Sequence, residues 1–214
     1  MVQLWVIPDD INLPLILLAA FVAAASPGPA TLTIAGTSMA SGRRYGLALA
    51  SGVTTGSWTW SIAAALGLGA VMLSYAWIFE VVRYVGAGYL LYLAFKSARS
   101  ALSPGELAPQ SMAASLRRAA YGKGLALHLT NPKAILFFGS LFAIGVPAGA
   151  SYGPLAIIIG AVGLQNAIIF HGYALLLSNR SVMARYVRLR RWFEATFAVA
   201  FGAAGLKILT ARLH

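Results

Sequence analysis

Cysteine is absent from this sequence of 214 residues, and charged residues are scarce. Without cysteine the chain forms no disulfide, no thiolate metal site and no cysteine nucleophile. Charged residues make up 10% of the chain and only five of them are acidic, whereas soluble domains carry about 25% charged residues. So little charge cannot solvate the surface of a soluble protein of this size. The shortage of charge therefore excludes an ordinary cytosolic enzyme.

Common enzyme motifs are missing as well. The sequence holds no Gly-rich phosphate loop before a Lys-Ser/Thr, no His-Glu-x-x-His and no acidic pair for a divalent metal. The net charge of +11 does not indicate nucleic acid, because the basic residues lie in short gaps between apolar runs rather than on one solvated face. We expect no enzyme activity, no cofactor, no metal and no nucleic-acid partner.

Hydrophobic residues, by contrast, make up 59% of the chain and gather in six long runs. A helix needs about 20 apolar residues to span a bilayer, and backbone groups at that depth must bond within their own segment. The strict alternation of barrel strands is missing. The first run resembles a signal-peptide core, but Asp9 and Asp10 precede it instead of basic residues, so we expect it to be retained. The expected fold class is an all-α membrane protein with six transmembrane helices, at residues 13–39, 46–73, 76–95, 123–147, 153–178 and 192–211.

Lysine and arginine residues indicate the orientation of these spans. The gaps after the first, third and fifth spans hold two, five and five of the sixteen basic residues. The amino-terminal segment and the gaps after the second and fourth spans hold none. Because cytoplasmic loops are enriched in basic residues, we expect both termini to be extracytoplasmic.

A segment rich in proline and glycine, residues 97–122, divides the chain into two halves, 1–96 and 123–214. We expect this segment to be a cytoplasmic linker. Three spans in each half make the halves run in opposite directions, which is the inverted-repeat plan of many secondary transporters. The first span of each half is interrupted, at Ser26-Pro27-Gly28-Pro29 and at Thr130-Asn131-Pro132-Lys133, where prolines cannot donate to the helix. Two matching breaks favour a binding site at mid-membrane over two kinks that only shape packing.

Lys133 lies about ten residues into the fourth span, or about 15 Å deep at 1.5 Å per residue. A cation at that depth is costly and is a candidate for function. It could meet a substrate carboxylate, respond to a proton or pair with a carboxylate across the bundle. The alternative is a structural cation that the freed carbonyls of a break satisfy.

Other polar residues in the spans are candidates for coupling, gating or binding. We take Glu80 as the intramembrane carboxylate, either as a gate or proton acceptor or in a local pair with Arg83 on the same helical face. His128 and His171 could shuttle protons or serve as hydrogen-bonded packing residues. Gln165 and Asn166 offer neutral donors and acceptors to a polar substrate, or join helices to one another.

Several stretches together resemble the lysine exporter (LysE/RhtB) family of bacterial amino-acid exporters. They are Ser26-Pro27-Gly28-Pro29, the segment from Gly42 to Leu47 with Gly52 and Gly56 beyond, the segment from Arg83 to Leu93, the segment from Leu129 to Phe138, and Gly205-Leu206-Lys207. Their order and spacing agree along most of the chain. The resemblance implies efflux of amino acids or similar small metabolites across the bacterial inner membrane, driven by an ion gradient or the membrane potential.

The expected mechanism is alternating access around a site between the two breaks. Half-helix amino ends and Lys133 would hold a carboxylate, and freed carbonyls would receive an ammonium group. A substrate with a cationic side chain would need an extra carboxylate at mid-membrane, and Glu80 is the only one that we take to lie there. Neutral or zwitterionic amino acids are therefore favoured. Expected partners are the amino acid, membrane lipid and a coupling ion, with the proton first, while a homo-oligomer stays open. A channel or an exporter of another solute or cation is the alternative. The expected binding residues are Ser26, Pro27, Gly28, Pro29, Asn131, Pro132, Lys133, Gln165 and Asn166.

Overall fold

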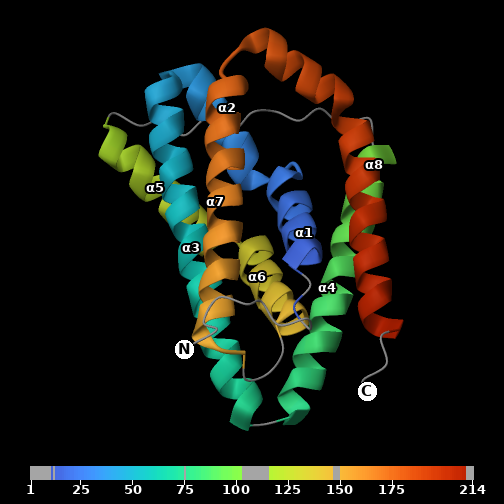
Figure 1. Cartoon of the computed structure of the whole chain (residues 1–214). Coiled ribbons are helices and arrows are strands. Elements are labelled where there is room, and N and C mark those ends of the chain that lie inside the picture. Colours follow the sequence, from blue (N-terminus) through green and yellow to red (C-terminus); the bar gives the residue numbers. More distant parts are fainter. Residues whose placement is uncertain (1–10, 12, 75, 103–115, 147–149, 211–214) are drawn as a thin grey trace.

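The computed structural model describes residue 11 and residues 13–74, 76–102, 116–146 and 150–210. All regular secondary structure in these residues is α-helical (Figure 1). The helices are α1 (Leu13–Ala25), α2 (Pro29–Ser41), α3 (Arg43–Ser74), α4 (Ala76–Leu102), α5 (Arg117–Leu129), α6 (Pro132–Gly145), α7 (Tyr152–Leu176) and α8 (Arg180–Thr210).

Both spans that were predicted to be broken consist of two helices. The first is the pair α1 and α2, which meet at an angle of 51°. The second is the pair α5 and α6, separated by Thr130 and Asn131. The remaining predicted spans each correspond to one helix, although α8 begins at Arg180, well before the predicted residue 192. Figure 1 shows α8 lying across the top of the view and then descending beside α4.

Among the described helices, α7 is long and apolar enough to cross a membrane by itself, and α1 and α2 reach the same measure only when counted as one bent span. The count of six spans and the antiparallel relation of the two halves therefore stay predictions. So does the division at residues 97–122, where α4 continues to Leu102 and α5 begins at Arg117. Residues 103–115 lie outside the described part of the chain.

The helices pack around buried apolar clusters and through close backbone contacts. The largest cluster joins α1, α3, α4, α6, α7 and α8, with Phe138, Ile158 and Phe201 among its members. Helices α3 and α5 approach so closely that a Cβ at Gly52 would collide with the carbonyl oxygen of Tyr121. Only glycine permits that approach, and it fixes α5 beside α3.

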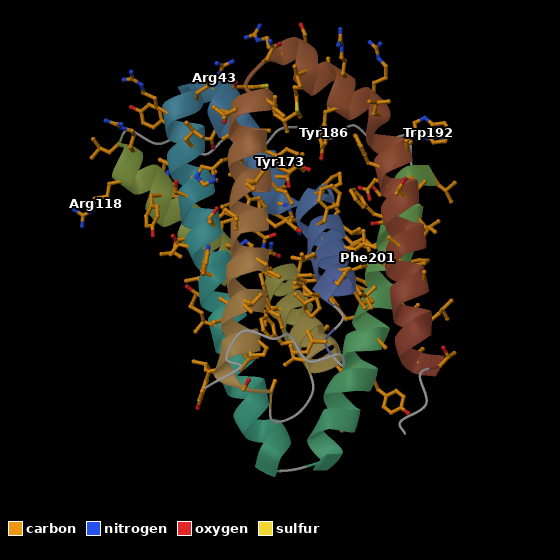
Figure 2. All side chains as sticks on the ribbon, in the orientation of Figure 1. Arg43, Arg118, Tyr173, Tyr186, Trp192 and Phe201 are labelled. Carbon is orange, nitrogen blue, oxygen red and sulfur yellow. The ribbon has the colours of Figure 1, made fainter. Side chains whose placement is uncertain are left out.

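One end of the bundle is basic. In Figure 2 side-chain nitrogens gather at the top of the view, where Arg43 is labelled. The guanidinium of Arg43 donates to the hydroxyl of Ser178 at 2.7 Å, and that of Arg191 donates to the carbonyl oxygen of Ala101 at 3.0 Å. These bonds connect residues from the first, third and fifth gaps between the predicted spans, while the side of the membrane on which these gaps lie stays a prediction.

Candidate substrate site between the two broken helices

Each proline at the first break leaves a carbonyl without its helical donor, and another group supplies one. A helical carbonyl accepts from the amide four residues later, and proline has none. The carbonyl that Pro27 cannot serve is that of Ala23, which accepts from the hydroxyl of Ser26 at 3.0 Å and from the ammonium of Lys133 at 3.1 Å. The carbonyl that Pro29 cannot serve is that of Ala25, which accepts from the hydroxyl of Tyr173 at 2.7 Å.

The second break follows the same rule with local donors. The carbonyl that Pro132 cannot serve is that of His128, which accepts from the amide of Asn131 at 3.2 Å. Helix α6 then starts at Pro132, where a missing amide hydrogen costs nothing. The side chain of Asn131 caps this helix by accepting from the amide of Lys133 at 3.0 Å.

Lys133 joins the two breaks. From the first turn of α6 its ammonium donates to the last turn of α1, to the carbonyl oxygen of Ala23 and to the hydroxyl oxygen of Ser26. The same ammonium lies 3.8 Å from the position that a Cβ on Gly28 would occupy. The geometry therefore supports the alternative that freed carbonyls satisfy the cation, and it also leaves Lys133 on the wall of two cavities.

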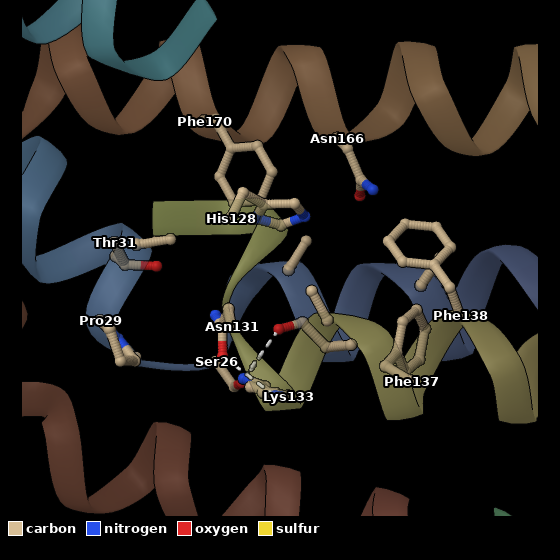
Figure 3. Close-up of a pocket in the computed structure, with 16 residues that line it drawn as sticks. Ser26, Pro29, Thr31, His128, Asn131, Lys133, Phe137, Phe138, Asn166 and Phe170 are labelled. Carbon is tan, nitrogen blue, oxygen red and sulfur yellow. Dashed lines mark hydrogen bonds between the residues drawn. The ribbon is translucent and has the colours of Figure 1, made fainter. Parts of the chain in front are cut away.

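The small cavity is lined by both breaks and by α7, and its volume is about 50 Å³. Figure 3 shows Lys133 and Ser26 on one side of it and Asn166, His128 and Phe170 on the other. Neither ring nitrogen of His128, nor the amide oxygen of Asn166, has a hydrogen-bond partner among the described residues. A buried water needs about 10–15 Å³ and two or more polar partners. The small cavity can thus hold a few waters or a polar fragment of a ligand.

The wide cavity lies on the other side of Lys133, and its volume is about 590 Å³. It shares Ser26, Gly28, Pro29, Asn131 and Lys133 with the small cavity. Its remaining wall comes largely from α4 and α8, from which the sequence analysis took no binding residue. Small-molecule sites typically measure about 300–1,000 Å³, so the wide cavity has the size of a ligand site.

Glu194 is the functional candidate that sequence reasoning missed. Its side chain is only 5% exposed, lies on α8 and lines the wide cavity. The expectation that Glu80 is the intramembrane carboxylate was incomplete, because Glu194 falls inside the predicted span 192–211. An ionisable residue inside a predicted span is by itself sufficient to mark a candidate functional residue. Lys96 and Ser100 of α4 line the same wall.

The predicted site residues divide into two groups. The structure brings together Ser26, Pro27, Gly28, Pro29, His128, Asn131, Lys133 and Asn166 around the two cavities. Two other residues join helices away from both cavities: Gln165 donates to the carbonyl oxygen of Leu17 at 3.1 Å, and His171 contacts the hydroxyl of Ser51 at 3.0 Å. For Gln165 and His171 the packing alternative describes the observed contacts. The side chains of Glu80, Arg83 and Pro132 lie outside the described part of the structure.

Comparison with known proteins connects this site to a family. The profile of the LysE type translocators matches residues 21–212, which include both breaks and Glu194. The chain belongs to the LysE family. This membership confirms the resemblance read from the motifs and gives the chain a multi-pass membrane location, and LysE proteins are transporters rather than enzymes.

Curated relatives of this LysE protein are named for efflux. A threonine efflux protein of Salmonella typhi is 29% identical over 197 residues, which cover 89% of this chain and 94% of the relative. The threonine efflux protein of Escherichia coli K12 is 29% identical over 198 residues, with the same two shares. A leucine efflux protein of Klebsiella pneumoniae is 33% identical over 165 residues, which cover 77% of each chain. No solved structure matches this LysE chain.

Proposed function

We propose that this chain exports neutral or zwitterionic amino acids across the bacterial inner membrane by alternating access. The observation that carries the proposal is the meeting of two proline-broken helices at Lys133, between two cavities. The threonine and leucine efflux proteins among its relatives supply the substrate class. Neither threonine nor leucine has a charged side chain, which agrees with the sequence-based preference for neutral or zwitterionic amino acids.

The substrate carboxylate would bind where Lys133 and the first turns of α2 and α6 converge. Both helices begin at a proline next to the cavities. The side chain of Asn131 already accepts from the first amide of α6, whereas α2 has no side-chain cap, so the first amides of α2 are the ones that a carboxylate can reach. The positive end of each helix dipole favours an anion there. A carboxylate that enters would compete with Ala23 and Ser26 for the ammonium of Lys133.

The Lys133 contact with α1 would act as the moving barrier. Lys133 and Ser26, which form this contact, line both the wide cavity and the small one. The wide cavity includes Lys96 and Ser100 near the carboxyl end of α4, on the approach to the basic loop that the sequence places in the cytoplasm. The described conformation is then the one that receives substrate from the cytoplasm, and rearrangement of Lys133 would pass it onward.

The test is transport by the purified full-length protein in proteoliposomes loaded with labelled leucine or threonine. We expect saturable flux that the unlabelled amino acid inhibits, and a proton gradient should accelerate it if the proton is the coupling ion. Flux that rises linearly with concentration and is not inhibited would establish a channel instead. Protein-dependent flux of a divalent cation without amino-acid flux would establish a cation exporter. Either result would refute the proposal.

A further inference from the structure

Glu194 is a deeply buried carboxylate with few partners among the described residues. It accepts one hydrogen bond from a described residue, from the hydroxyl of Ser100 at 3.0 Å. No described cationic side chain forms an ion pair with it, although Lys96 lines the same cavity. A buried carboxylate is costly unless it is paired and hydrogen-bonded. This arrangement leaves acceptor capacity on Glu194 that a ligand can use.

Lys133 stands in the same cavity with the opposite charge. It reaches the cavity from α6, while Glu194 reaches it from α8. The described contacts of the two side chains include no ion pair between them. The wide cavity is thus lined by two cations, Lys133 and Lys96, and by one carboxylate, Glu194. It offers both signs of charge that the binding site of a zwitterion needs.

The backbone carbonyls of the breaks are poor candidates for the substrate's ammonium group. The carbonyls of Ala23, Ala25 and His128, which the prolines set free, already have donors. The sequence-based expectation was that freed carbonyls receive the ammonium, but each of these three carbonyls already accepts at least one hydrogen bond. Among the described residues the carboxylate of Glu194 has one partner, the neutral hydroxyl of Ser100, and a carboxylate is a stronger acceptor for an ammonium group than a backbone carbonyl.

We propose that Glu194 binds the α-ammonium group of the transported amino acid while Lys133 binds its carboxylate. This inference rests on the proposed function and deepens it, because it specifies both charged ends of the substrate. Apolar side chains of the same cavity, among them Leu93, Leu136 and Phe201, would contact the substrate's side chain. Such a site selects amino acids against 2-hydroxy acids, which lack the ammonium, and against simple amines, which lack the carboxylate.

The experiment compares three ligands on purified full-length protein by thermal shift and by titration. The ligands are leucine, its 2-hydroxy-acid analogue and isoamylamine, which lacks the carboxylate; threonine and its 2-hydroxy-acid analogue form a second series. A ligand that binds the native state raises the melting temperature. We expect wild-type protein to prefer leucine or threonine to the corresponding hydroxy acid by about tenfold or more, as loss of a charged hydrogen bond implies.

The decisive variant is Glu194→Gln, which keeps an acceptor for Ser100 and removes the charge. Its Kd for the amino acid should rise about tenfold or more, while its Kd for the hydroxy acid should stay the same, so that the preference disappears. Glu106→Gln removes one carboxylate from the predicted linker, and we expect it to keep wild-type preference. Should Glu194→Gln fail to fold, Ser100→Ala removes the described hydrogen bond to Glu194 instead. The wild-type ligand series still measures the preference for the amino acid over the hydroxy acid without any variant.

Three results would overturn the inference. Unchanged affinity and preference in Glu194→Gln would show that the carboxylate does not meet the ammonium. Equal losses for the amino acid and the hydroxy acid would assign Glu194 a structural role. Wild-type protein that binds hydroxy acid as well as amino acid would exclude an ammonium site. By contrast, wild-type protein that neither binds nor transports leucine or threonine would refute the proposed function, and the inference with it.

Discussion

Replacing Lys133 with methionine tests the role of the cation at the centre of the site. The substitution keeps a long unbranched side chain and removes the charge and both hydrogen bonds, to Ala23 and Ser26. Hydrogen bonds to a charged group contribute about 1.5–3 kcal/mol each. The desolvation cost of a buried ion is several kcal/mol and disappears at the same time. Because Ser26 still donates to the Ala23 carbonyl, we expect a net stability change within about 1–2 kcal/mol.

Transport should respond far more strongly than stability. A substrate carboxylate that loses one charged partner loses about 1.5–3 kcal/mol, which corresponds to a rise in Kd of about 10- to 150-fold. Proteoliposome efflux of leucine and threonine measures the transport effect, and thermal unfolding without ligand measures stability. Lys123→Met is the matched control, since Lys123 is an exposed residue on α5 that lines neither cavity. Saturable efflux by Lys133→Met with an unchanged half-saturation concentration would remove Lys133 from the mechanism.

Two further predictions concern packing and orientation. Gly52→Ala places a methyl group against the backbone of Tyr121 and should lower the free energy of unfolding by about 1–3 kcal/mol. Gly122→Ala is the control, because a Cβ there meets nothing within 4 Å, and it should not lower the free energy of unfolding. Equal melting temperatures of the two variants would contradict the close α3–α5 contact. Because the chain has no cysteine, single cysteines at Arg118 and Tyr152, both exposed, can be labelled in intact cells with an impermeant thiol reagent. We expect labelling at residue 152 and protection at residue 118, and the reverse pattern would invert the predicted orientation.

Sequence reasoning located the breaks well because their cause is local. Pro27, Pro29 and Pro132 each lack an amide hydrogen in any fold, so the interruption of the helix can be predicted directly from the amino-acid sequence. Lys133 was found for a similar reason, since its distance from the start of an apolar run is a matter of counting. The place of a residue within an apolar run can therefore be read from the sequence, while the depth of Lys133 in the membrane stays a prediction.

The direction in which a residue faces was not predictable in the same way. Helices α1 and α7 are apolar on most of their surface, so the pattern does not mark which side meets the bundle. Asn166 and Gln165 are adjacent in sequence, yet one lines the small cavity and the other bonds to α1. The bond from Tyr173 to Ala25 spans 148 residues, and tertiary packing alone creates it. The position of Glu194 inside a predicted span is enough to identify it as a candidate, but its hydrogen bond with Ser100 could be found only in the structure.

The donors that replace the proline amides have a mechanical consequence. At the first break they are side chains of other elements, Lys133 of α6 and Tyr173 of α7, together with the local hydroxyl of Ser26. Flexing this joint requires the release of those side chains and does not require any turn of α1 or α2 to unwind. The energy at stake is then that of a few exchangeable hydrogen bonds, about 1 kcal/mol each and more where the donor is charged. We therefore expect any flexing of the first broken helix to depend mainly on side chains of α6 and α7.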